Sequence, residues 1–277
     1  MEVREAEMRS ADGLRLFYRV WREPAVPAPR LVVLLHGFAD HSGRYGPLVE
    51  HLCGRQAVVY GLDQRGNGRS EGARGHVMDY REFVRDLDDF SDLARKSEPG
   101  LECTLYAHST AGIFALHYML AHPETFTRCV LSAPALILAV KAPAWKTAIG
   151  RALAGPLPTL ALKAGFSADV LSRDPEAVRA NVEDPLVTQA ITTRMYRETY
   201  LRAAPEALAR IEALKVPFLY VQGGDDQLVS TEVAREFERR AHVAHRVIVY
   251  PDARHEVHND INREQLFSDV DAWLEAS

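Results

Sequence analysis

Short apolar runs alternate along the chain with longer segments whose apolar residues are spaced as on one face of a helix. Residues 31–35 and 57–62 are continuous apolar runs of strand length, whereas Phe83, Leu87 and Phe90 recur at helical spacing. The predicted strands are residues 14–21, 31–35, 57–62, 103–107, 128–132, 217–222 and 246–250, and the predicted helices are residues 79–97, 111–121, 205–214, 231–240 and 261–275. Such alternation predicts an α/β fold with a mostly parallel central sheet and helices on both faces.

The alternation breaks once, between Ala135 and Ala204, where no short β-branched run appears and Ala, Leu and Pro are abundant. We therefore expect residues 1–134 and 205–277 to form the core and residues 135–204, the cap segment, to be a helical insertion. Ligands of such sheets bind at the carboxyl ends of the strands. The loops that follow the predicted strands are thus the places to look for chemistry.

Ser109 stands between a predicted strand and a predicted helix, within Tyr-Ala-His-Ser-Thr-Ala-Gly. A serine on such a sharp turn presents its hydroxyl above the sheet and is a candidate nucleophile. The turn requires small residues two positions before and after the serine. Ala107 and Ala111 meet this demand, although the usual pattern has glycines there. The alternative is a serine that only caps the helix.

Candidates for an acid and a base follow Ser109 in the order Ser, Asp, His that this kind of site uses. Asp226, with Asp225 as the alternative, comes after the strand at residues 217–222, and either could instead be a turn residue. His255 follows the strand at residues 246–250 and is favoured over His258. An imidazole activates a serine hydroxyl when a carboxylate holds its tautomer. The sequence His-Glu-Val-His lacks the spacing of a zinc motif, so we predict no metal and no cofactor.

Two backbone N–H groups are candidates for stabilising the oxyanion of acyl transfer. One is that of Thr110, the residue after the predicted nucleophile, and the other is that of Phe38, in the loop after the strand at residues 31–35. Gly37 permits close approach of this loop. His36 is expected to organise the loop rather than to act as a base, because it stands in the wrong chain position.

Charge and composition exclude several other classes of function. The 277 residues carry a net charge of −5, which gives no reason to expect nucleic acid as a partner. We find no secretory signal and no apolar stretch long enough to span a bilayer, so we expect a cytoplasmic protein. Three cysteines without paired spacing argue against a disulfide framework, and Cys103 and Cys129 are expected to be buried. The sequence predicts no oligomeric state.

These segments together resemble the monoacylglycerol lipase and lysophospholipase branch of the α/β-hydrolases, which includes hydrolases of the serine aminopeptidase S33 type. The most specific matches are His-Gly-Phe-Ala-Asp-His-Ser-Gly-Arg-Tyr at residues 36–45 and Asp-Gln-Arg-Gly-Asn-Gly-Arg-Ser-Glu-Gly at residues 63–72. The resemblance implies the α/β-hydrolase fold, a cap over the site, an acyl-chain tunnel and hydrolysis of lipid-like monoesters.

By position, the resemblance assigns a catalytic triad of Ser109, Asp226 and His255, oxyanion donors at Phe38 and Thr110, and an alcohol pocket shaped by Arg44 and His258. Two departures from the family are visible. Alanines flank Ser109, and Asn181 stands where monoacylglycerol lipases carry a pocket tyrosine. The loop at residues 63–72 is expected to be structural, fixed by Asp63 and Arg65.

The expected partner is a small-molecule or lipid ester, cleaved through an acyl-enzyme. The same triad could serve amide, thioester or carbon–carbon hydrolysis, or acyl transfer, and a non-catalytic binding protein on this fold is a further alternative. The apolar residues of the cap segment predict either transient contact with a membrane surface or packing on the core.

Overall fold

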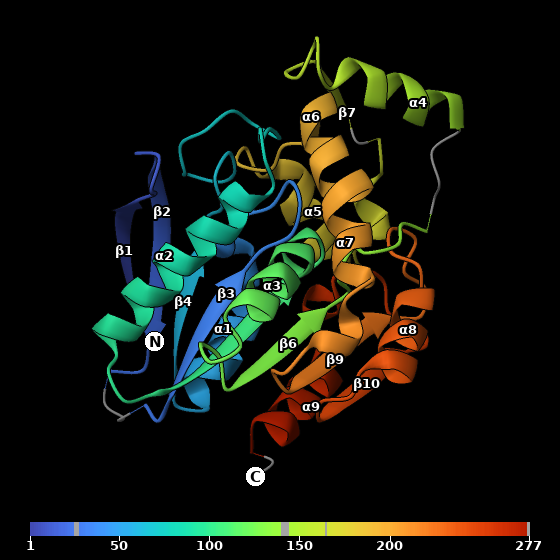
Figure 1. The fold of residues 1–277 in the computed structure, drawn as a ribbon. Coiled ribbons are helices and arrows are strands. Elements are labelled where there is room, and N and C mark those ends of the chain that lie inside the picture. The colour runs from blue at the N-terminus through green and yellow to red at the C-terminus, as the bar shows by residue number, and fades with distance from the viewer. Residues whose placement is uncertain (25–27, 140–143, 164, 276–277) are drawn as a thin grey trace.

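The computed structural model describes residues 1–24, 28–139, 144–163 and 165–275. Within them, eight strands form one central sheet whose faces are covered by helices (Figure 1). In spatial order the strands are β1 (Glu2–Arg9), β2 (Arg15–Arg22), β4 (Ala57–Leu62), β3 (Arg30–Leu35), β5 (Glu102–His108), β6 (Arg128–Ser132), β9 (Phe218–Gly223) and β10 (His245–Tyr250). β2 is antiparallel to both of its neighbours, and the pairs from β4 to β10 are parallel. The predicted α/β class with a mostly parallel sheet is confirmed.

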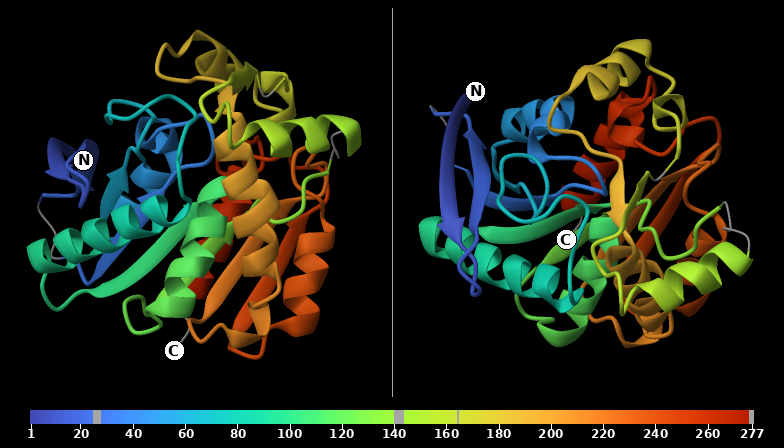
Figure 2. Two further views of the ribbon diagram at one scale, coloured as in Figure 1. Left: turned by 45° about the horizontal axis from the view of Figure 1, so that its top comes forward. Right: turned by 90° about the horizontal axis from the view of Figure 1, so that it is seen from above.

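Alternate residues of the central strands point into two separate hydrophobic cores. In β3, Leu31, Val33 and Leu35 enter the first core, while Val32 and Leu34 enter the second. The first core is covered by α2 (Arg81–Ser97), α3 (Thr110–Ala121) and α8 (Glu232–Arg240), and the second by α1 (Gly46–Gly54) and α9 (Arg263–Glu275). Viewed from above, the two groups of helices lie on opposite sides of the sheet (Figure 2). Burial on both faces is why these strands read as continuous apolar runs.

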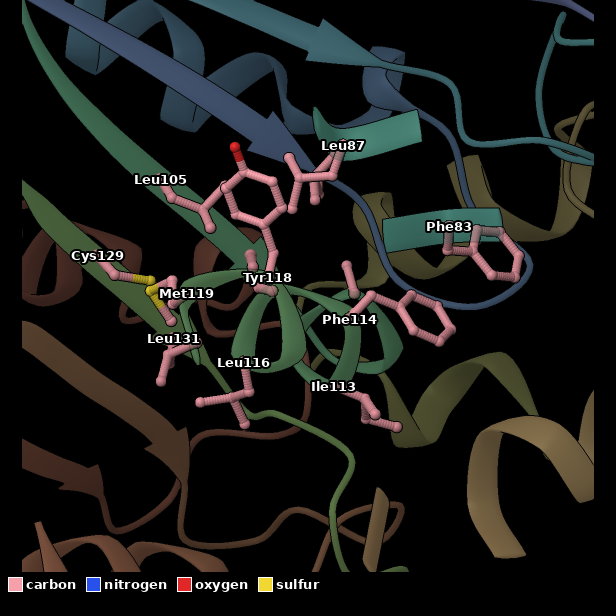
Figure 3. Packing of buried hydrophobic residues seen from close by; sticks show 14 of the residues in the cluster. Phe83, Leu87, Leu105, Ile113, Phe114, Leu116, Tyr118, Met119, Cys129 and Leu131 are labelled. Carbon is pink, nitrogen blue, oxygen red and sulfur yellow. The ribbon is translucent and has the colours of Figure 1, made fainter. Parts of the chain in front are cut away.

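Helix α3 lies at the centre of the first core and is apolar on nearly all sides. Its Phe114 stacks on Phe83 of α2 with ring centroids 4.4 Å apart, and its Met119 lies beside Cys129 and Leu131 of β6 (Figure 3). Each such buried side chain contributes roughly 1.5–3 kcal/mol to stability. This packing fixes the start of α3, and with it the position of Ser109, relative to the sheet.

The cap segment lies beyond the carboxyl ends of the central strands (Figure 1). It holds α4 (Ala144–Leu153), α5 (Pro175–Glu183), α6 (Thr193–Tyr196), a π-helical turn (Arg197–Ala203) and a small antiparallel pair, β7 (Ala161–Lys163) with β8 (Ala190–Thr192). No strand is predicted in this segment, because each of the two has only three residues and gives no periodic pattern.

The helix predicted to begin at Pro205 begins earlier. α6, the π-helical turn and α7 (Ala204–Leu208) follow one another without a gap, so the predicted boundary after Ala204 lies inside a helical run. Proline favours the first turn of a helix, which is why the sequence suggested a start there. Two further elements, β1 and α1, are absent from the sequence prediction.

The loop at residues 63–72 is held as predicted. Asp63 accepts hydrogen bonds from the N–H groups of Ser42 and Arg69, each at 2.9 Å. Arg65 is buried and pairs with Asp86 at 2.6 Å.

All three cysteines are buried, as expected for Cys103 and Cys129, and none of the three forms a disulfide. No helix among those described has both the length and the apolar character needed to cross a bilayer.

Candidate active site

Ser109 occupies the strained turn that joins β5 to α3. Its φ of 54° and ψ of −121° lie in a region that residues other than glycine rarely adopt. Ala107 and Ala111 are fully buried on either side of the turn, where larger side chains would collide. Gly112 meets a stricter limit, since a Cβ there would lie 2.6 Å from the Cβ of Pro134. These small residues allow strand, helix and neighbouring loop to meet closely beneath the serine.

Ser109, His255 and Asp226 form one chain of hydrogen bonds. His255 Nε2 lies 2.9 Å from Ser109 Oγ, and His255 Nδ1 lies 2.8 Å from Asp226 Oδ2. Because the carboxylate can only accept, Nδ1 carries the proton and Nε2 is left to accept the proton of the serine hydroxyl. The predicted order Ser, Asp, His thus places three distant residues within hydrogen-bonding distance.

Asp226, and not Asp225, is the acid that reaches His255. Asp226 Oδ1 accepts the N–H groups of Leu228 at 2.9 Å and Val229 at 3.0 Å, so the carboxylate is held in one orientation. The side chain of Asp225 is 54% exposed and faces Arg254 at 3.6 Å. Sequence position alone left the two acids as alternatives, and the geometry separates them.

A buried amide, that of Gln222, approaches the same Asp226 oxygen that bonds His255. Gln222 donates to the backbone oxygen of Val229 at 2.9 Å and approaches Asp226 Oδ2 at 3.4 Å. Its amide oxygen accepts the hydroxyl of Tyr220 at 2.5 Å. Gln222 was not among the predicted site residues, since a glutamine inside a strand carries no signal that it faces an acid from the next loop.

The local charges set the proton affinity of His255. Burial alone would lower the pKa of His255, but the negative charge of Asp226 and its hydrogen bond outweigh that effect, and the pKa is raised above 6.5. His108 packs against the ring of His255 and His258 packs against the ring of His108, and burial lowers the pKa of both, that of His258 to about 4. Of the three imidazoles, the one that faces the serine is therefore the one whose pKa is raised.

This raised pKa makes a prediction about pH. Only neutral His255 can accept the serine proton, so kcat/KM should fall as the pH drops through the pKa of His255. Because that pKa is raised, the acid limb is expected above pH 6.5. The measurement is kcat/KM for an uncharged ester between about pH 5 and pH 9, the range where histidine titrates. If kcat/KM fell only at a pH below the pKa of a free histidine side chain, or did not fall at all on the acid side, the assignment of His255 as the base would be contradicted.

The loop that carries Phe38 lies directly against Ser109. A Cβ added to Gly37 would lie 3.0 Å from Ser109 Cβ and 3.2 Å from His108 Cδ2, so a side chain here would press on the nucleophile turn. Thr110 begins α3, and its N–H has no acceptor in a preceding helical turn. His36 accepts the N–H of Gln64 at 2.9 Å and faces the oxygen of Gly37 at 2.7 Å, the organising contacts expected of it.

A cavity of about 930 Å³ opens onto Ser109 and His255. Most of its wall is apolar, with side chains that include Phe38, Leu138, Leu162, Val187, Ile191 and Leu228. One part is polar and holds Asp40, Arg44, Asn181 and Glu256. An apolar chamber with a few convergent polar groups is typical of a small-molecule site.

Arg44 lines this cavity, but protein groups already engage its guanidinium. It donates to Asp40 Oδ1 at 2.9 Å and to both carboxylate oxygens of Glu256 at 3.0 Å. The amide of Asn181 faces Arg44 with its oxygen, because the opposite orientation would set donor against donor, and it accepts from Nη1 at 3.1 Å and Nη2 at 3.2 Å. Asn181, which the sequence places where the resembling family has a tyrosine, is thus a third hydrogen-bond partner of the Arg44 guanidinium.

His258 is placed differently from its predicted role in the alcohol pocket. It is completely buried, its ring stacks on Tyr45 with centroids 4.5 Å apart, and it is not among the described residues that line the cavity. Neither ring nitrogen has a hydrogen-bond partner within the described part of the chain. His258 therefore supports the wall behind His255 and does not contact the chamber.

Polar contacts fasten the second half of the cap segment to the loops that carry the site. Arg173 pairs with Asp260 at 2.7 Å, and Ser172 donates to the oxygen of Asn259 at 2.8 Å. On the other side, Asp184 faces His41 Nε2 at 2.8 Å. These contacts connect residues 172–184 to the His255 loop and to the loop of Phe38.

The parallel sheet, the strained turn at Ser109 and the order of the converging side chains define an α/β-hydrolase. Comparison with known proteins agrees. The family described as serine aminopeptidase, S33, matches residues 27–262, and the chain belongs to this family.

Several relatives with similar sequences are lipases. The chain is 31% identical to a monoacylglycerol lipase of Mycolicibacterium smegmatis over 98% of this chain and 96% of the relative. It is 32% identical to the monoglyceride lipase of Homo sapiens over 96% of this chain and 88% of the relative. Among solved structures, the monoacylglycerol lipase of Paleococcus ferrophilus superposes with a TM-score of 0.82 at 29% identity, covering 99% of this chain and 98% of that one. The chain is thus similar to monoacylglycerol lipases over nearly its whole length.

Proposed function

We propose that this chain is a serine hydrolase that cleaves carboxylic esters of lipid-like monoacyl substrates. The observation that carries the proposal is the hydrogen-bonded chain Ser109–His255–Asp226 at the wall of a largely apolar cavity. An apolar chamber favours an acyl chain because burying each CH₂ group contributes about 0.8 kcal/mol. The similarity to monoacylglycerol lipases supports the same class of substrate.

The reaction follows from the positions of the donors and acceptors. Ser109 Oγ attacks the ester carbonyl while His255 Nε2 accepts its proton, and the N–H groups of Phe38 and Thr110 stabilise the oxyanion. The ester C–O bond then breaks, and His255 returns the proton to the leaving alcohol. Water, deprotonated by His255, attacks the acyl-enzyme and releases the carboxylic acid. Asp226 keeps the imidazole in the required tautomer throughout.

We further propose that residues 135–204 act as a cap over this reaction. The cap segment supplies much of the apolar wall, Leu138, Leu162 and Ile191 among its residues. Leu157, Leu160 and Leu162 are also exposed, at 51%, 40% and 58%. Exposed leucines in the segment that supplies part of the cavity wall support the predicted contact with a lipid surface, which stays a prediction.

The charge of the polar part of the cavity selects among lipid esters. Two carboxylates, Asp40 and Glu256, face the single guanidinium of Arg44, and the Arg44 charge holds the pKa of Glu256 at about 2 despite burial, so this carboxylate is ionised at neutral pH. A neutral diol can exchange hydrogen bonds with these groups, whereas a phosphate placed among them would meet two carboxylates and a guanidinium that protein groups already engage.

We therefore expect a monoacylglycerol to be cleaved with a kcat/KM at least about tenfold above that of the lysophosphatidate with the same acyl chain, since like charges brought together typically cost several kcal/mol. Release of fatty acid from the two matched substrates measures this ratio. Faster cleavage of the phosphate-bearing lipid would contradict the inference that the polar part of the cavity accepts a neutral diol.

The proposed function itself has a separate test. Hydrolysis of aminoacyl p-nitroanilides without any ester turnover would overturn it.

A further inference from the structure

The helix that passes over the site contains a π-helical turn, Arg197–Ala203. The N–H of Ala204 bonds to the oxygen of Thr199, five residues earlier, and Pro205, which has no N–H, follows at once. π-helical turns are rare and concentrate at functional sites. This turn carries Tyr200, which lines the cavity and whose hydroxyl lies 3.0 Å from the side-chain hydroxyl of Thr110.

Helix α3 holds the π-helical turn at two points. Thr110 and His117 are seven residues apart and therefore lie on the same face of α3, two turns from each other. Thr110 contacts Tyr200, and His117 Nε2 lies 2.9 Å from the oxygen of Ala203. Because that partner is a carbonyl, the imidazole donates. One residue of register corresponds to about 100° of rotation around an α-helix, so the wider turn decides which side chain faces Thr110.

Thr110 is also the residue whose N–H is assigned to the oxyanion. The only side-chain hydrogen bond that the structure records for Thr110, within its described residues, is the one to Tyr200. Burial raises the pKa of Tyr200, which therefore keeps its hydroxyl proton at neutral pH and can donate or accept in this bond.

We propose that Tyr200 is a positioning residue for ester hydrolysis: its hydroxyl, presented by the π-helical turn, holds Thr110 so that the Thr110 N–H stays aimed at the oxyanion. The proposal rests on the proposed function. The contact acts on a group that matters most in the transition state, so its loss lowers kcat and leaves KM nearly unchanged.

The test compares Tyr200→Phe, Thr110→Val and the double variant with the wild type on a p-nitrophenyl ester. A hydrogen bond between neutral groups contributes about 0.5–1.5 kcal/mol, so each single variant is expected to lose roughly 3- to 10-fold in kcat with KM changed less than about twofold. Since both variants remove the same contact, the double variant is expected to be no slower than the slower single variant. Thr110→Ser, which keeps a hydroxyl, is expected to lose less than Thr110→Val.

Tyr118→Phe is the matched control. It removes a buried phenol hydroxyl from α3, the helix that also carries Thr110. This hydroxyl bonds to Asp88 at 3.0 Å and to Thr125 at 3.2 Å, and Tyr118 does not line the cavity as described. This variant should melt at a lower temperature and keep its kcat.

Three outcomes overturn the inference while the wild type remains active. They are an unchanged kcat for Tyr200→Phe, additive losses in the double variant, or an equal loss of kcat in Tyr118→Phe. A wild type without ester turnover, and without labelling of Ser109 by a fluorophosphonate, removes the proposed function together with this inference.

Discussion

Replacing Ser109 by alanine is expected to lower ester turnover by at least about 10³-fold, the scale seen when a serine nucleophile is removed. No other hydroxyl lies within hydrogen-bonding distance of His255 Nε2 in the described structure. The fold should survive, because alanine is smaller than serine and faces the same backbone strain at a φ of 54°. Initial rates on a p-nitrophenyl ester, with circular dichroism to confirm folding, provide the measurement.

Ser132→Ala is the matched control for this change. Ser132 also carries a buried hydroxyl close to the site, 3.1 Å from His108 Nδ1, but it does not contact His255. Turnover in this variant should stay within a few-fold of the wild type, the scale of one neutral hydrogen bond. If Ser109→Ala kept a tenth or more of the wild-type rate, Ser109 would not be the nucleophile.

Replacing Asp226 by asparagine should lower kcat by about 10⁴-fold, as the equivalent change does in a serine protease triad. The N–H groups of Leu228 and Val229 both point at one oxygen of residue 226, so an asparagine would keep its carbonyl oxygen there and turn its amino group toward His255. The imidazole would then accept at Nδ1 and carry its proton at Nε2. In that tautomer it could no longer accept the proton of Ser109.

Asp225→Asn gives the direct comparison, because Asp225 is the adjacent residue and is exposed. It is expected to change kcat by less than about twofold, the small effect usual for exposed substitutions away from a site. Kinetics of both variants at one pH measure the difference. A larger loss in Asp225→Asn than in Asp226→Asn would show that the acid had been assigned to the wrong residue.

The strands buried on both faces are the part of the fold that the sequence predicts best. Residues 57–62 and 128–132 are predicted to the residue, since parallel strands inside two cores have apolar residues on both faces, as with Cys129, Val130 and Leu131 in the second of these. β1 is missed for the opposite reason. It is an edge strand with charged and mostly exposed side chains, so it shows no apolar run.

The chemistry could be predicted from chain order, and the fine geometry could not. Ser109 and His255 stand at the ends of predicted elements, which identifies them before any coordinates. Asp225 and Asp226 are neighbours in one loop, and only the direction of each side chain separates them. Tyr200 reaches Thr110 through a π-helical turn in the cap segment, for which no periodic pattern exists.

Reaction with a fluorophosphonate followed by peptide mapping in a mass spectrometer tests the central claim most directly, because only an activated serine forms the adduct. The account predicts one adduct per chain, on Ser109, in the folded protein, and none in urea or in the His255→Ala variant. An adduct on another residue, or an unlabelled Ser109 in the folded wild type, would contradict it.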